Sequence, residues 1–159
     1  AELHDIPFDV EEDKARTYDI YAELVAGKLK PLEGVMQFMD TCRKRGLKLA
    51  LASSADPVKI ETNLHELGIG HDTFQVLVSG LDIQHKKPAP DIFLKAAERL
   101  EVAINRCLVV EDAISGVKAG KSAGAKVLAL TTSFNEEALA EADWIAANLA
   151  EAGDEVLNW

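Results

Sequence analysis

The sequence is poor in cysteine and in basic residues, and it contains no long apolar run. Two cysteines, Cys42 and Cys107, are too few for a secreted fold held by disulfides, so they are expected to be buried thiols in a reducing compartment. The formal net charge of −10 disfavours binding to nucleic acid or to an anionic membrane. No segment has membrane-spanning length and the first stretch is acidic, unlike a signal peptide, so the expected location is the cytoplasm.

The apolar residues alternate between strand-like and helix-like spacing along most of the chain. Apolar strands bounded by helices predict a Rossmann-like parallel sheet with helices on both faces, in the α/β class. Asp56 is the predicted N-cap of one helix and Gly124 the predicted C-cap of another. Strands are predicted at 47–52, 74–80, 107–112 and 126–132, and helices at 9–29, 31–46, 56–68, 89–101, 114–124 and, more weakly, 136–142, before a short apolar segment at 143–146.

Polar residues follow three of these strands: Ser53 and Ser54, then Ser79, then Glu111 and Asp112. In parallel sheets ligands bind at the carboxyl ends of the strands. The sequence therefore predicts that these side chains converge at one edge of the sheet.

The stretch "SGVKAGKS" resembles a phosphate-binding P-loop, but it does not have the spacing of one. A P-loop requires G-x-x-x-x-G-K-[ST], and here Ser115 stands where the first glycine belongs. Two acidic residues also precede it, where phosphates would approach. Gly116, Gly120 and Gly124 are better explained by close packing of a helix on the sheet.

Adjacent carboxylates at the end of an apolar strand disfavour each other's ionisation, and a divalent cation removes that cost. Glu111 and Asp112 form such a pair. Mg²⁺ suits them, because it takes one or two protein carboxylates and completes its shell with water and phosphate. On this pair alone, a metal site and a helix cap by Asp112 are equally good explanations.

Two further features are ambiguous when taken alone. Lys87 precedes Pro88 in "QHKKPAPDIF" and could direct its ammonium at a phosphate, although most lysines, such as its neighbour Lys86, are solvated. Ser53 and Ser54 lie between a strand and a helix, where hydroxyl and N–H groups suit an anion, but serine is also common at such ends.

The histidines and tryptophans carry no recognisable motif. The histidines have no metal-ligand spacing, which argues against zinc, and are expected at the surface. The tryptophans are expected to pack. These residues are His4, His65, His71 and His85, and Trp144 and Trp159.

The order of the motifs is more specific than any one of them. A strand ending in serine, then "KPAPDIF", then "VVEDAISGVKAGKSAG" resembles the haloacid dehalogenase superfamily, in its β-phosphoglucomutase and sugar-phosphate phosphatase branch. The resemblance runs from about residue 32 to the end of the chain. It implies Mg²⁺-dependent phosphoryl transfer through an aspartyl-phosphate.

The resemblance also implies roles for individual residues. Ser53 would bind the transferring phosphoryl group through its hydroxyl, helped by the Ser54 backbone N–H. Lys87 would neutralise charge on the phosphoryl oxygens and on the nucleophile. Asp112 would hold Mg²⁺, with Glu111 either as a nearer ligand or as an outer partner of the site.

One part of the family pattern is missing, namely the first strand ending in D-x-D, which supplies the nucleophile and the acid/base. Asp9 and Glu11 do not replace it, because no apolar strand precedes them and Pro7 opposes one. We therefore expect residues 1–30 to be the remainder of a helical cap and its linker, and residues 31–159 to be a core without its first strand. The missing segment would belong to the same protein or to another chain, unless the sheet is rearranged or swapped.

These expectations combine into one function. The complete protein is predicted to be a Mg²⁺-dependent phosphatase of small phosphorylated metabolites, with sugar phosphates as the favoured substrates. The alternatives are a phosphohexomutase like β-phosphoglucomutase and a non-catalytic phosphate-binding module. The 159-residue chain alone is expected to be inactive, because nothing in it replaces the nucleophile.

Overall fold

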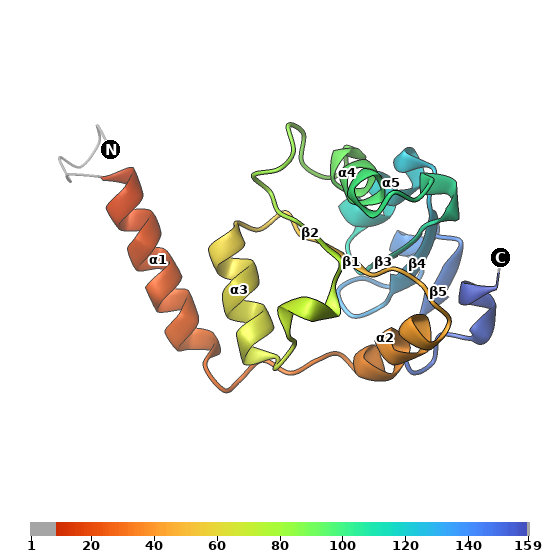
Figure 1. Cartoon of the computed structure of the whole chain (residues 1–159), viewed down its shortest axis with the longest axis horizontal. Coiled ribbons are helices and arrows are strands. Elements are labelled where there is room, and N and C mark those ends of the chain that lie inside the picture. Colours follow the sequence, from red (N-terminus) through yellow and green to blue (C-terminus); the bar gives the residue numbers. More distant parts are fainter. Residues whose placement is uncertain (1–8, 159) are drawn as a thin grey trace.

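The computed structural model describes residues 9–158, in which strands and helices alternate as predicted (Figure 1). The predicted strands form, each shortened at its ends, and the apolar segment at 143–146 contributes a fifth. The helices are α1 (Val10–Val25), α2 (Val35–Lys44), α3 (Pro57–Glu66), α4 (Asp91–Leu100) and α5 (Ile114–Ala123). The strands are β1 (Ala50–Ala52), β2 (Val76–Val78), β3 (Leu108–Glu111), β4 (Lys126–Leu130) and β5 (Trp144–Ala146).

All strand pairs are parallel, and they form two sheets. One sheet pairs β1 with β2, and the other has the order β3-β4-β5. The parallel α/β fold is confirmed. Within residues 9–158, β1 and β3 each pair with one strand only.

Side chains of β4 alternate between the two faces of its sheet, as expected for period-two geometry. Val127 and Ala129 belong to the core formed with α4 and α5, whereas Leu128 and Leu130 belong to a second core, against which Phe38 of α2 packs. All four β4 residues are buried, which explains why this strand is apolar on both faces.

The helices hold the two sheets together. On one face α4 contacts β1 and β2, α5 contacts β3 and β4, and the two helices contact each other. On the other face Val35 of α2 packs against the apolar clusters of both sheets. Figure 1 shows α4 and α5 above the strands and α2 below them.

The prediction of a helix at 136–142 is wrong. Only a 3-10 turn forms, at Glu137–Leu139. The side chain of Leu139 is fully buried, and the Asp143 N–H donates to the Val127 carbonyl, so the chain is already entering β5. Too few residues separate these two anchors for a regular helix.

The predicted N-cap position of Asp56 is confirmed, but its carboxylate bonds elsewhere. Asp56 occupies the N-cap position of α3 with extended backbone angles, but its carboxylate makes no cap hydrogen bond. It accepts instead from Lys14 at 2.6 Å and from the Tyr18 hydroxyl at 2.5 Å, both from α1. The Lys14 ammonium and the Tyr18 hydroxyl therefore take the carboxylate that would otherwise accept from the first N–H groups of α3.

The first helix is confirmed, and it lies beside α3 (Figure 1). None of its residues is buried. Polar contacts dock it: besides the Asp56 pair, Tyr21 donates to Asn63 at 2.6 Å and the Gly27 N–H donates to Glu66 at 2.7 Å. Asp9 caps its N-terminus by accepting from the N–H groups of residues 11 and 12, which agrees with rejecting it as a strand-borne nucleophile.

Within residues 9–158, every helix is too short or too polar to cross a membrane.

Candidate active site

The carboxylate pair lies at the carboxyl edge of the β3-β4-β5 sheet. Glu111 is the last residue of β3 and Asp112 follows it. Glu111 lies opposite Ala129 in the parallel register, so the residues just after β4 emerge beside Asp112. The sheet therefore brings two segments that are about twenty residues apart to the same place.

Lys87 forms an ion pair with Glu111, joining two of the predicted site residues. Only 14% of the Lys87 side chain and 10% of the Glu111 side chain are exposed. The Lys87 ammonium also lies over the Phe93 ring, 4.9 Å from its centre. Lys86 is exposed. The two adjacent lysines thus differ, and Lys87 is not one of the solvated lysines that dominate protein surfaces.

Asp112 does not cap α5. Ala113 occupies the N-cap position, and the α5 N-terminus has no side-chain cap. The Asp112 Oδ2 accepts from the Ser133 hydroxyl at 2.5 Å and from the Thr132 hydroxyl at 3.2 Å. Among the described residues, Oδ1 has no hydrogen-bond partner. The sequence alone allowed Asp112 to be either a helix cap or a metal ligand, and the structure excludes the helix cap.

Thr132 and Ser133, the donors to Asp112, are not among the site residues predicted from the sequence. The available signal was "TTS" directly after the apolar run "KVLAL", because hydroxyl residues there emerge at the same sheet edge as the carboxylates. Neither residue forms a recognised motif. Their importance depends on which strand lies beside β3.

Ser53 and Ser54 follow β1, in the other sheet. The Ser53 N–H donates to the Val78 carbonyl at 2.9 Å, and the Ser53 Oγ accepts from the Ala55 N–H at 3.2 Å. The Ser53 hydroxyl proton and the Ser54 N–H have no acceptor within the described part of the chain. The hydrogen bonds of residues 9–158 do not link these serines to Lys87, Glu111 or Asp112.

Ser79 has a different function from that of the other residues predicted at this edge. It is 7% exposed, and both its N–H and its hydroxyl donate to Asp82 Oδ2 at 2.7 Å. Arg99 donates to the other oxygen of Asp82 at 2.6 Å. These hydrogen bonds, that from the Ser79 N–H above all, lower the pKa of Asp82 to about 2. Ser79 therefore anchors the loop after β2.

The glycines of α5 have two functions rather than one. Gly120 lets the helix approach Val127 and Val109, and Gly124 ends it with a φ of +87°, both as predicted. Gly116 differs, because its missing side chain leaves room for the Glu111 carboxylate. Gly116 thus also lets α5 pack closely on the sheet, as predicted, but its neighbour is the carboxylate of Glu111 at the end of β3, a charged group of the candidate site.

The donors at this edge fit Mg²⁺ better than a transition metal. Within residues 9–158 no group of three or more His, Cys, Asp or Glu residues is placed to hold a metal ion. The free Asp112 oxygen matches the one or two carboxylates that Mg²⁺ uses, with water and phosphate completing the shell. His65, His71 and His85 are exposed, as predicted, whereas His4 and Trp159 lie outside the described residues.

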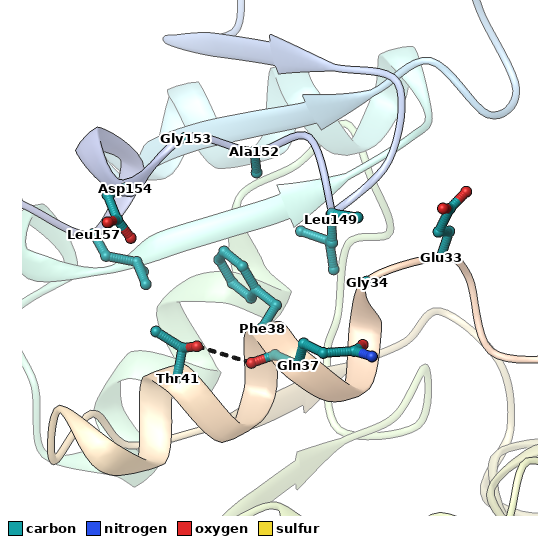
Figure 2. A pocket seen from close by; sticks show the side chains of 11 residues that line it. Glu33, Gly34, Gln37, Phe38, Thr41, Leu149, Ala152, Gly153, Asp154 and Leu157 are labelled. Atoms are coloured by element: carbon teal, nitrogen blue, oxygen red, sulfur yellow. Dashed lines mark hydrogen bonds between the residues drawn. The ribbon is translucent and has the colours of Figure 1, made fainter.

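A pocket of about 400 Å³ lies elsewhere, between α2 and the segment after β5 (Figure 2). Phe38 and Thr41 of α2 face Leu149 and Leu157 across it. None of the predicted site residues lines it. The candidate site is therefore the strand edge and not this pocket.

Comparisons with known proteins identify the family of the chain. The family model described as haloacid dehalogenase-like hydrolase matches residues 2–124. The chain is 38% identical over 140 residues to Protein SUPPRESSOR OF QUENCHING 1, chloroplastic, of Arabidopsis thaliana, a match that covers 85% of the chain. It is 33% identical over 147 residues to the Phosphorylated carbohydrates phosphatase of Thermotoga maritima, which covers 91% of the chain.

A solved structure supports the fold. A variant of CbbY from Rhodobacter sphaeroides, in complex with xylulose-(1,5)bisphosphate, superposes with a TM-score of 0.85 at 24% identity, over 96% of this chain and 70% of that one. The curated relatives are longer. The chain spans 13% of the Arabidopsis protein, 34% and 46% of two other relatives, and 68% of the Thermotoga phosphatase.

Proposed function

Since the chain belongs to the haloacid dehalogenase-like hydrolase family, we propose that the protein is a Mg²⁺-dependent phosphatase of small phosphorylated metabolites. Sugar phosphates are the proposed substrate class. The Thermotoga relative, whose name refers to phosphorylated carbohydrates, supports this choice.

The proposal rests on two observations together. The Lys87–Glu111 ion pair is largely buried, and the Oδ1 of the next residue, Asp112, has no hydrogen-bond partner within residues 9–158. If the Lys87–Glu111 ion pair were purely structural, it would not require a further carboxylate, that of Asp112, with one free oxygen at the same strand end. Phosphoryl transfer needs positioned positive charge and a cation site, because charge accumulates on the phosphoryl oxygens.

Each proposed residue has a chemical task. Lys87 keeps N–H donors beyond its bond to Glu111, and these would neutralise the phosphoryl oxygens. The Ser53 hydroxyl proton and the Ser54 N–H would donate to the same group. Asp112, with Glu111 beside it, would hold Mg²⁺, and the ion when bound would withdraw charge from the phosphate.

We also propose that the nucleophile of an aspartyl-phosphate mechanism lies on a strand outside this chain, between β1 and β3. Three observations support this position. Within residues 9–158, β1 and β3 are edge strands of the two sheets, and helices on both faces span the junction. Val110 of β3 is also 38% exposed, although it lies in an apolar strand. In this view residues 1–30 are a cap remnant and linker, and residues 31–159 are the core without its first strand.

The test uses the complete protein, a panel of phosphorylated sugars and Mg²⁺. We expect phosphate release that requires Mg²⁺ and falls at least about a hundredfold in Asp112→Asn. Near-normal turnover by that variant would defeat the metal assignment. Transfer of phosphate between positions of a hexose, without net release, would instead indicate the mutase, and phosphate binding without turnover would indicate the binding module.

The isolated chain provides a second test. We expect residues 1–159 to release no phosphate, since the proposed nucleophile is not among them. Turnover by this chain, free of contaminants and sensitive to Asp112→Asn, would show that the nucleophile lies within it and would overturn the proposed strand.

A further inference from the structure

We propose that Ser133 and Thr132 are positioning residues that orient the Asp112 carboxylate for the cation. Their hydroxyls would hold Oδ2, so that Oδ1 is presented to the metal. This inference rests on the magnesium site of the proposed function. It adds two residues outside the motifs that led to that site.

The two hydroxyls converge on one oxygen atom. Ser133 Oγ donates to Asp112 Oδ2 at 2.5 Å and Thr132 Oγ1 donates to the same oxygen at 3.2 Å. Both donors are exposed, so water could satisfy them equally well. Neither bond is needed to satisfy a buried group, which makes orientation of the carboxylate the more specific explanation.

The loop that carries these hydroxyls is anchored at its start. Thr131, directly before them, donates its N–H to the Ala146 carbonyl at 3.0 Å, at the end of β5. Pairing of β3 with β4 sets Glu111 opposite Ala129. Two parallel strands therefore fix the distance between the carboxylate and its donors, and no helix has to move to bring them together.

Orientation matters because an aspartate side chain, with two rotatable bonds, adopts several rotamers in water. Donors that favour one rotamer lower the entropy lost when a cation binds, and loss of such outer partners typically weakens metal binding by about 10- to 100-fold. One oxygen that carries both hydrogen bonds leaves the other oxygen available to a cation.

The test measures Mn²⁺ binding by the complete protein, using electron paramagnetic resonance and Mn²⁺ as the probe. We expect the double variant Ser133→Ala, Thr132→Val to bind Mn²⁺ about tenfold more weakly than the unsubstituted protein. Ser133→Thr, which keeps a hydroxyl, should retain binding. Thr62→Val is the matched control, because the Thr62 hydroxyl donates only to the Val58 carbonyl of its own helix.

A second measurement needs no metal. Three-bond NMR couplings should show one χ1 rotamer for Asp112 in the unsubstituted protein and averaged rotamers in the double variant. Unchanged couplings and unchanged Mn²⁺ affinity in the double variant would overturn the positioning role, while loss of binding in Asp112→Asn alone would leave the metal site standing. If the unsubstituted complete protein fails to bind Mn²⁺, or if its Asp112→Asn variant binds it normally, the metal site of the proposed function falls, and this inference falls with it.

Discussion

The carboxylate of Glu111 lies against the Cα of Gly116, in the space that a side chain at position 116 would occupy. A methyl group there would overlap the Glu111 carboxylate, and the same carboxylate pairs with Lys87. A glycine in the first turn of α5 thus controls where a charged group of the candidate site can stand.

Gly116→Ala should disturb the site while sparing the fold. The atoms that an added Cβ would meet are at the end of a flexible side chain, so Glu111 can move aside, and alanine favours the helix by up to about 1 kcal/mol. We expect the free energy of unfolding to fall by less than about 3–5 kcal/mol, the cost of a broken buried pair, because the flexible Lys87 can follow the displaced carboxylate, together with a shifted NMR signal of the Lys87 Nζ or Cε group. A drop in stability with an unmoved Lys87 signal would contradict this account.

Gly120→Ala is the matched control from the same helix. Its added Cβ would lie 2.8 Å from Val127 Cγ2 and 3.3 Å from Val109 Cγ1, both core side chains. We expect overpacking to cost about 1–2 kcal/mol in urea unfolding, with the Lys87 signal unchanged.

Replacing Lys87 should be costly, and a second change should relieve the cost. In Lys87→Met the Glu111 carboxylate, 10% exposed, loses its ammonium partner, and breaking such a pair costs about 3–5 kcal/mol. Adding Glu111→Gln removes the unpaired charge and should recover most of the loss. Urea unfolding of the four proteins in a double-mutant cycle measures the coupling, and Lys86→Met should stay within about 0.5 kcal/mol of the unsubstituted chain. Additive effects at 87 and 111 would argue against the pair.

Asp143 should stabilise the fold in a way that depends on pH. Burial opposes its ionisation, but hydrogen bonds from Lys121, Lys126 and the Val127 N–H outweigh burial and lower the pKa of Asp143 to about 2. Because the pKa is lowered in the folded state, the stabilisation is complete above the unfolded value of about 4 and is lost as the pH falls toward 2.

Asp143→Asn should therefore lower the free energy of unfolding by about 2 kcal/mol at pH 7. The difference between the two proteins should shrink between pH 4 and pH 2. Urea unfolding across this range measures it. A difference that stays constant down to pH 2 would show that the carboxylate charge is not the cause.

Docking of α1 can be followed through a tyrosine. The hydrogen bond that Tyr18 donates to Asp56 raises the pKa of the Tyr18 phenol above its usual value. A raised pKa means that the contact stabilises α1 at lower pH and is lost as the pH rises through the folded pKa. In Tyr21→Phe, which leaves Tyr18 as the one tyrosine, ultraviolet titration should show this late transition. Asp56→Asn in the same background should move the transition to lower pH, and an unmoved transition would contradict the contact.

The sequence by itself determined the order of strands and helices, because apolar spacing and glycines act locally. The face of α2 that contains Met39 and Cys42, the stops at Gly46 and Gly124, and the apolar β4 could all be predicted from neighbours in the chain. There are two exceptions, the 3-10 turn at Glu137–Leu139 and the carboxylate of Asp56, which does not cap α3. In both, a partner distant in the sequence outcompeted the local preference.

Only the tertiary structure decided what the candidate site residues contact. "KKP" and "VVED" indicated Lys87, Glu111 and Asp112, but their local sequence could not reveal that Lys87 pairs with Glu111. It also could not reveal that hydroxyls beyond β4 take one oxygen of Asp112. These contacts join residues about twenty positions apart, and the order of strands in the sheet, rather than the propensity of any segment, brings such residues together.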